Sequence, residues 1–225
     1  MEWFSFTAFL GYLTNGFLLM GVLVTLGMTV ATVIGGMALG MVIAFARMSP
    51  NGVLNQLARC YLWVFRGTPL LIQLVIIYTG LPQLGLKLGV LESSLLALIL
   101  NEAAYLAEII RSGFMGVSAG QREAADSLGL PRWLVVWKVT LPQAFRLMIP
   151  PLGNSINGLL KSTSITSVIS MEELMRRSQM LMQEKFQVLE VFGAAAVFYL
   201  VLTTGWGLIQ IRLERHFGAS QAARS

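Results

Sequence analysis

The residues in this sequence that are best suited to chemistry are polar side chains within long apolar segments. Asn101, Glu102 and Tyr105 lie together in one such segment. A second apolar segment contains a polar run made of Asn154, Ser155, Asn157, Lys161, Ser162, Thr163 and Ser164. Amide and charged groups are costly inside a membrane, where they often mark a solute pathway. Two interpretations stay open: these groups line a polar pocket, or they hydrogen-bond across helices and hold the structure together.

Catalytic chemistry fits the sequence poorly. The one histidine, His216, lies in a basic tail, which excludes a histidine-rich metal site and disfavours a histidine-activated nucleophile. The one cysteine, Cys60, has no second cysteine with which to form an internal disulfide. We therefore place an intramembrane enzyme last among the function classes that we consider.

The composition is that of a membrane protein. Of the 225 residues, 56% are hydrophobic and only 12% are charged, and the mean hydropathy is +0.71. Soluble domains carry about 25% charged residues, so this composition excludes a soluble globular enzyme, a disordered tail and a collagen-like fibre. The net charge of +5 includes no basic run that could follow a phosphate backbone, so we expect no nucleic-acid partner. The sequence predicts an all-α protein embedded in a lipid bilayer.

The apolar pattern predicts five transmembrane helices, since one span needs about 20 residues. They are expected over residues 16–46, 61–81, 93–110, 147–169 and 188–211. An aromatic interfacial helix is expected over residues 1–15. The remaining residues are expected to form polar connections over 47–59, 82–92, 111–146 and 171–186, and a basic tail over 212–225. Within the second span, Arg66, Gly67, Thr68 and Pro69 predict an irregular helix, which a membrane tolerates where the backbone lines a cavity.

The distribution of Lys and Arg predicts the orientation of these spans. Of the 16 basic residues, eleven fall on one side and four on the other, while Lys161 lies within the fourth predicted span. Membrane proteins keep Lys and Arg on the cytoplasmic side. We therefore expect the N-terminus outside, the C-terminus in the cytoplasm, and the long segment 111–146 in the cytoplasm.

The cytoplasmic segment carries the strongest local pattern of the chain. Gly129 is suited to the left-handed position that ends a helix, and Pro131 to the first turn of the next helix. Before them lie two small and two charged residues, Arg122, Glu123, Ala124 and Ala125. The small residues would allow close contact with a soluble partner, and the charges would fix its register. A plain amphipathic loop helix is the alternative from these residues alone.

The spacing in this segment resembles the EAA loop of ABC importer permeases. Glu123-Ala124-Ala125 is followed after three residues by Gly129, and after nine more by residues 139–142, Val-Thr-Leu-Pro, where the family usually has Ile-x-Leu-Pro. Five further segments resemble the polar amino-acid subfamily in the correct order, namely residues 65–70, 80–83, 103–111, 142–146 and 150–154. The chain is thus similar to the permease subunit of a histidine-, glutamine-, arginine- or cystine-type ABC importer. A channel or facilitator, the alternative, has no use for the EAA spacing.

This resemblance implies a type I ABC importer permease, with residues 1–225 as a single transmembrane domain in the bacterial inner membrane. It implies four kinds of partner: a cytoplasmic ABC ATPase dimer, a second permease subunit, an extracytoplasmic substrate-binding protein and an amino-acid substrate. A homodimer is preferred for the permease, and a paralogue is possible. The coupling to the ATPase would be carried by Arg122, Glu123, Ala124, Ala125 and Gly129.

We expect the chain to bind no cofactor and to be no enzyme, because ATP and Mg would sit on the ATPase. Residues 153–158 have the glycine spacing of a phosphate-binding loop, but Leu159 stands where that loop needs lysine. The resemblance therefore leaves the motor to another chain.

The polar residues within the spans are the candidates for binding an amino acid, since its carboxylate needs donors and its ammonium group needs acceptors. The candidate substrate-binding residues are Gly67, Thr68, Asn101, Glu102, Tyr105, Asn154, Ser162 and Ser164. For Lys161 a structural or lipid-interface role is preferred. The family commonly has Lys-Asp-Thr-Ser at 161–164, and this chain has Ser162 in place of the acid. That departure favours a neutral polar substrate such as glutamine or cystine. The mixed charges of 171–186 predict the docking surface for the binding protein, or else a solvated loop.

Overall fold

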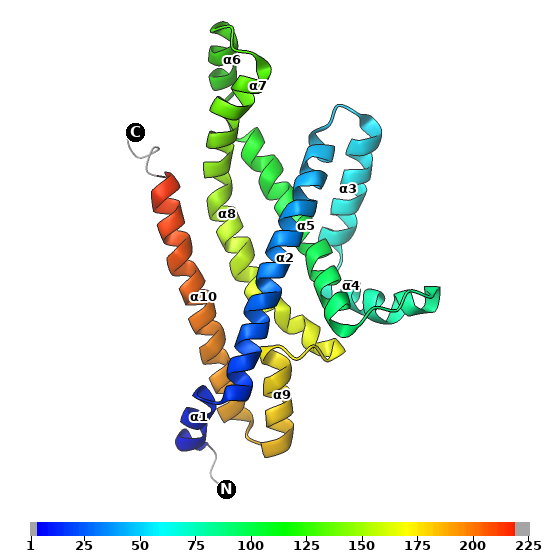
Figure 1. Ribbon diagram of the computed structural model, residues 1–225, viewed down its shortest axis with the longest axis vertical. Helices are drawn as coiled ribbons and strands as arrows, with labels where there is room; N and C mark the ends of the chain where they lie inside the picture. Colours follow the sequence, from blue (N-terminus) through cyan, green and yellow to red (C-terminus); the bar gives the residue numbers. More distant parts are fainter. Residues whose placement is uncertain (1–3, 219–225) are drawn as a thin grey trace.

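The computed structural model describes residues 4–218, and within them it consists of helices and short connections without strands (Figure 1). In chain order these are α1 (Phe6–Leu13), α2 (Gly16–Met48), α3 (Gly52–Gly67), α4 (Leu70–Val75), η1 (Ile76–Gly80), η2 (Leu81–Leu84), α5 (Val90–Met115), α6 (Ala119–Ser127), α7 (Arg132–Leu134), η3 (Val135–Thr140), α8 (Leu141–Ser162), η4 (Thr163–Ile169), α9 (Leu174–Lys185) and α10 (Val188–Gly218). The predicted all-α class is confirmed.

Three helices are long and apolar enough to cross a membrane by themselves. They are α2, α5 and α10, and they correspond to the first, third and fifth predicted spans. Helix α2 lies against α5, and close approach is possible because Gly40 brings the two backbones together. A Cβ atom at Gly40 would lie 3.1 Å from the Ala103 carbonyl oxygen. These two helices form the centre of the bundle, and α3, α4, α8 and α9 pack on one or both of them.

The second predicted span is broken, at the place where the sequence predicts irregularity. Helix α3 ends at Gly67, and the segment from α4 to η2 leaves it at an angle of 104°. Pro69 disfavours a helical conformation for the residue before it, and Thr68 is accordingly extended, with φ −119° and ψ 146°. At its other end α3 begins at Gly52, where Asn51 caps it. Much of the predicted connection 47–59 is therefore helix.

The fourth predicted span differs in its limits and in its character. Helix α8 begins at Leu141, inside the predicted cytoplasmic segment, and the last residues of the predicted span form the 3-10 helix η4. With 22 residues α8 is long enough to be a span, but it is not apolar enough to qualify as one, because it is rich in polar side chains. Five spans and their orientation thus stay predictions, with three spans and a bent fourth supported by helix length and composition.

The predicted charged loop 171–186 is mostly the helix α9. The Glu173 side chain caps this helix and accepts hydrogen bonds from the backbone N–H groups of Met175 and Arg176, at 2.8 and 2.9 Å. This cap satisfies two N–H groups that would otherwise lack partners. Burial raises the pKa of the Glu173 carboxyl, while the hydrogen bonds it accepts oppose that shift.

Different segments of the chain lie at the two ends of the molecule (Figure 1). The connection between α2 and α3, helices α6 and α7, and the end of α10 lie toward one end, whereas α1 and α9 lie toward the other. Helix α1 falls within the predicted interfacial segment, of which residues 1–3 lie outside the described part. It is fastened to α10, because the Ser5 backbone N–H donates to Glu190 at 2.7 Å. Residues 219–225 of the predicted basic tail also lie outside the described part.

Candidate functional site

The helix end that the sequence predicts at Gly129 is confirmed. This residue has a φ of +72°, a left-handed conformation that glycine adopts without steric cost. Its N–H donates to the Asp126 carbonyl at 2.9 Å, and the N–H of Leu130 donates to the Ala125 carbonyl at 3.3 Å. These two bonds close the end of α6 in a Schellman motif. The spacing from Ala125 to Gly129 in the sequence thus corresponds to the last turn of α6.

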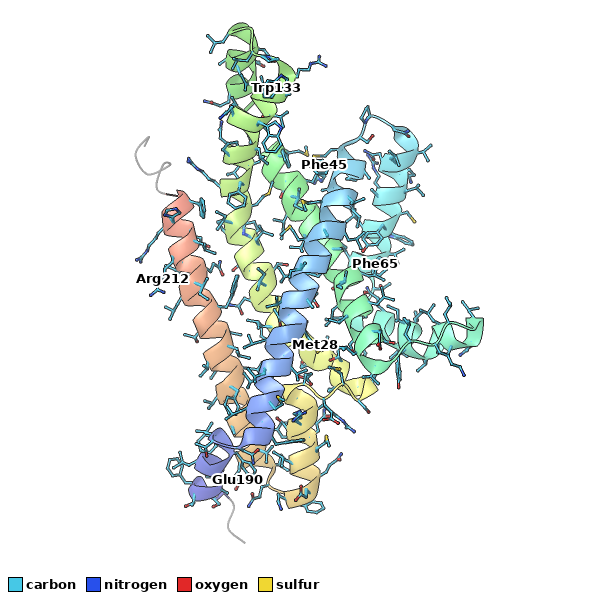
Figure 2. All side chains as sticks on the ribbon, in the orientation of Figure 1. Met28, Phe45, Phe65, Trp133, Glu190 and Arg212 are labelled. Atoms are coloured by element: carbon cyan, nitrogen blue, oxygen red, sulfur yellow. The ribbon has the colours of Figure 1, made fainter. Side chains whose placement is uncertain are left out.

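The residues predicted to couple to the ATPase do not all face outward. Glu123 and Ala124 are exposed, whereas Ala125 is 4% exposed and packs within the chain. Arg122 lies in α6, and its side chain falls outside the described part. Sequence reasoning missed two apolar residues next to them, Leu128 and Trp133, which are 79% and 64% exposed. Trp133 lies at the far tip of the molecule in Figure 2.

This exposed tip is joined to the centre of the bundle by nearly continuous helix. Helix α7 begins after Pro131, passes into the π-helical turn η3, and leads directly into α8. Helix α6 packs against η3, and α8 packs against α5 and α10. Helix α6 is thus connected through η3 to α8, whose later residues begin the polar run of the sequence.

The break between α3 and α4 is held by a buried side chain that the sequence analysis did not select. Gln73 is 6% exposed, and its Nε2 lies within 3.1 Å of the carbonyl oxygens of Phe65 and Thr68. It also donates to the Thr68 hydroxyl at 2.9 Å. Asn101 of α5 completes the group, because its Nδ2 donates to Gln73 Oε1 at 3.0 Å and to the Phe65 carbonyl at 3.1 Å. Phe65 is labelled in Figure 2.

Two predicted pocket residues, Thr68 and Asn101, thus meet through Gln73. Their described hydrogen bonds satisfy backbone groups that the break leaves free. The signal that would have found Gln73 is an amide in an apolar segment directly after the Thr68-Pro69 break. Gly67 lies at the exposed end of α3 beside this group.

Glu102 faces away from its neighbour Asn101 and bonds to a different helix. It is 7% exposed and accepts a hydrogen bond from the Ser155 hydroxyl of α8 at 2.5 Å. Its side chain also lies beside Gly36, where an added Cβ would come within 3.4 Å of Glu102 Cγ. A carboxylate inside the bundle therefore connects α5 with α8, the helix that leads through η3 to the exposed tip.

Tyr105 of α5 lies in a second polar group, together with Glu108 and Arg111 of the same helix and Arg66 of α3. It is partly exposed, and the Arg66 guanidinium carbon lies 5.6 Å from the centre of its ring, in cation–π range. Glu108 is 3.8 Å from Arg66 and accepts two 3.0 Å bonds from Arg111. The sequence analysis placed Tyr105 in the pocket but assigned no role to Arg66 or Glu108.

The other predicted pocket residues are not joined to these groups by a described contact. Asn154 is exposed and accepts a 3.5 Å hydrogen bond from Gln210 of α10. The Ser162 hydroxyl donates to the Gly158 carbonyl at 3.2 Å, and that of Ser164 to the Lys161 carbonyl at 2.6 Å. Their substrate-binding role stays a prediction. Within residues 4–218, no group of three or more metal-ligating side chains gathers at these positions or elsewhere.

Apolar helices around polar groups, with an exposed helical loop at one end, are the architecture of a membrane transport subunit. Residues 36–218 match the family described as binding-protein-dependent transport system inner membrane component. The chain therefore belongs to this family of inner-membrane permease components of ABC transporters. The predicted family, the permease function and the inner-membrane location are confirmed.

Individual relatives agree with this assignment. The glutamine transport system permease protein GlnP of Escherichia coli (strain K12) is 38% identical over 200 residues, covering 88% of this chain and 91% of that protein. The arginine transport system permease protein ArgU of Corynebacterium glutamicum is 37% identical over 230 residues, covering 96% of this chain and 73% of that protein.

Solved structures agree on the fold. The crystal structure of an amino acid ABC transporter with histidines matches with a TM-score of 0.85 at 36% identity, covering 89% of this chain and 94% of that chain. An inward-facing MetNI methionine ABC transporter is similar in fold, with a TM-score of 0.73 at 20% identity over 89% of this chain and 95% of that one. The predicted type I permease fold is confirmed.

Replacing Gln73 tests whether the bend depends on this one side chain. Gln73→Leu keeps the approximate size but leaves Asn101 Nδ2 and two carbonyl oxygens with fewer partners, each at a cost of about 1–3 kcal/mol. We expect a lower melting temperature of the purified protein. Gln56→Leu is the matched control, because Gln56 is exposed on α3. Equal melting temperatures for the two variants would contradict the role of Gln73.

Proposed function

We propose that this permease imports a polar amino acid by alternating access, driven by ATP hydrolysis on a separate subunit. One observation carries the proposal: the exposed loop and the buried Glu102 are linked through an unbroken run of helical elements, α7, η3 and α8, of which α8 contains Pro150 and Pro151. This run begins with α7, which follows α6 along the chain. It ends with α8, which carries the Ser155 hydroxyl that donates to Glu102. A movement imposed at the loop would therefore change the polar centre of the bundle. We treat residues 1–225 as one permease domain.

The partner at the exposed loop would be the ABC ATPase dimer. Glu123 and Ala124 are accessible on α6, and the neighbouring Leu128 and Trp133 offer apolar contact area. Apolar and aromatic side chains of this kind usually dominate the energy of a protein interface. ATP and Mg would bind to that subunit, because none of the Gly-x-x-x-x-Gly segments of this chain is followed by lysine. The permease itself would bind no cofactor.

A second permease subunit would cover the arm formed by α4, η1 and η2. Figure 1 shows this arm extending sideways from the bundle, away from the other helices. Its exposed apolar side chains are Leu71, Ile72, Val75, Ile76 and Leu84. Lipid would cover some of them, and a second subunit packed against the arm would cover the others. We prefer an identical copy as the partner, with a paralogue as the alternative.

The substrate would be a neutral polar amino acid such as glutamine or cystine. A cationic side chain requires acidic partners, and the family's acid after the lysine is replaced here by Ser162. Glu102 is the remaining pocket carboxylate, and Ser155 already bonds to it. The GlnP relatives are named as glutamine permeases, which supports this preference. The candidate pocket keeps Asn101 and Tyr105 as hydrogen-bonding groups.

The binding protein would dock at the opposite end, on α9. Exposed charges of both signs lie there, on Glu172, Glu184 and Lys185. Burial of the Glu173 cap fixes the first turn of the helix, so the exposed charges are presented from a rigid support. Complementary charges guide the approach of a soluble partner more than they strengthen its final binding.

The proposed function is tested by ATP hydrolysis of the assembled complex in liposomes, with its binding protein and a panel of amino acids. We expect stimulation by a neutral polar amino acid and weaker or no stimulation by arginine and lysine. Stimulation by arginine alone would overturn the substrate assignment. Uptake in the absence of an ATPase subunit would instead favour a facilitator.

The coupling assignment is tested by the double variant Glu123→Lys with Gly129→Asp. The first change reverses a charge on the exposed face of α6, and the second introduces a side chain at a φ of +72°. We expect transport to be abolished while the subunit still inserts into the membrane. Glu92→Lys is the control, because it makes the same charge change at an exposed position far from α6. Full transport by the double variant would disprove the assignment.

The homodimer is tested by expressing two copies of this chain with different affinity tags. An identical partner predicts that purification through one tag also recovers the other. Ile72→Arg places a charge on the arm and should lower that recovery. Recovery of a second, different permease and of no second copy would identify a paralogue instead.

A further inference from the structure

Two arginines converge on one neutral side chain near the connection between α2 and α3. Arg47 Nη1 donates to Asn55 Oδ1 at 3.1 Å, and Arg59 Nε donates to the same oxygen at 2.8 Å. Asn55 Nδ2 in turn donates to the Arg47 carbonyl at 2.5 Å, which fixes the amide. Two positive charges are thus held close together around a group that carries no charge.

Neither of these guanidinium groups forms an ion pair with a carboxylate in residues 4–218. The nearest acidic group on the adjoining helix, Glu108, is already shared by Arg111 at 3.0 Å and Arg66 at 3.8 Å. The charge of Arg47 acts on Glu108 only beyond ion-pair distance. Like charges held together without a counter-ion repel one another, so an external anion at this position is favoured.

The donors of the pair match an oxyanion with several oxygens. The described hydrogen bonds use one nitrogen of each guanidinium group and leave the others available. A planar guanidinium group binds phosphate through two parallel hydrogen bonds, and two such groups can enclose it. Asn51 caps α3 through the N–H groups of Val53 and Leu54, so the connection that carries the pair is rigid.

The surroundings indicate a lipid rather than a soluble anion. On α2 and α3, within six residues of Arg47 or Arg59 along the chain, large apolar side chains are exposed, namely Val42, Phe45, Val53, Leu57 and Trp63. With 33 residues, α2 is about 50 Å long, about 20 Å longer than the hydrocarbon core is thick, so it reaches into the headgroup regions. Arg59 lies seven residues into α3, about 10 Å from its start, and so near the level of the lipid phosphates.

We propose that Arg47 and Arg59 form a binding site for the phosphate of an anionic phospholipid, at the end of the molecule that carries α6 and α7. The apolar side chains beside the pair would contact the acyl chains. Basic side chains at the membrane surface each contribute about fivefold to the binding of anionic lipid. The site lies outside the candidate pocket and the coupling segment.

The test measures lipid retention by the purified full chain with its co-purifying subunits, in detergent micelles with added phosphatidylglycerol or phosphatidylcholine. Native mass spectrometry counts the bound lipid, and melting temperatures report its effect. We expect phosphatidylglycerol to be retained in preference to phosphatidylcholine. Arg59→Gln should weaken its apparent affinity about fivefold, and Arg59→Glu, which also gives Arg47 an internal partner, about thirtyfold.

Arg212→Glu is the matched control, because Arg212 is exposed on α10, away from the pair (Figure 2). It should leave the affinity for phosphatidylglycerol unchanged. Each of three results would overturn the proposal. Arg59→Glu could retain phosphatidylglycerol like the unaltered chain, or Arg212→Glu could lose it equally, which would indicate general surface charge. Inorganic phosphate could also raise the melting temperature as much as the lipid does, which would indicate a soluble anion.

Discussion

A helix that breaks inside a membrane leaves backbone groups without partners, and no water is present there to bind them. This chain breaks its second apolar segment at Thr68-Pro69, and the arrangement of the remaining helices depends on how the freed carbonyl groups are satisfied. Gln73 returns from α4 to the carbonyls of Phe65 and Thr68, and Asn101 reaches the same place from α5. The bend is therefore fixed by hydrogen bonds between three elements, and it turns α4 to η2 away from the bundle.

Helix α5 presents different polar groups on different faces. Tyr105 is exposed on one face, and Arg66 and Glu108 lie beside it. On the other side of α5, Glu102 is buried against Ser155 of α8. One helix thus carries an accessible polar surface and a buried polar contact on different faces.

The two ends of the molecule are built for different contacts. At one end, α6 and α7 present a short, capped helical loop that leads directly into α8. At the other end, α9 is fixed by the buried Glu173 cap, and α1 is fastened to α10 through Glu190. A permease that passes a solute from one side to the other requires such a difference. The connection between the ends runs through the packing of α8 on α5.

The sequence by itself determined the membrane class, the three unbroken apolar helices and the family. Those properties depend on composition, on runs of apolar residues and on local spacing, such as the interval from Ala125 to the left-handed Gly129. The position of the helix break could also be predicted, since a proline acts on the residue directly before it.

Only the tertiary structure decided the direction of the bend, the partners of the polar residues and the burial of Ala125. Asn101 and Glu102 are adjacent, yet successive residues of a helix point about 100° apart, so they meet different neighbours. Which neighbour each one meets depends on contacts with Gln73 and Ser155, which lie 28 and 53 residues away along the chain. The physical reason is that local sequence determines whether a segment is helical or broken, whereas long-range packing determines what each side chain contacts.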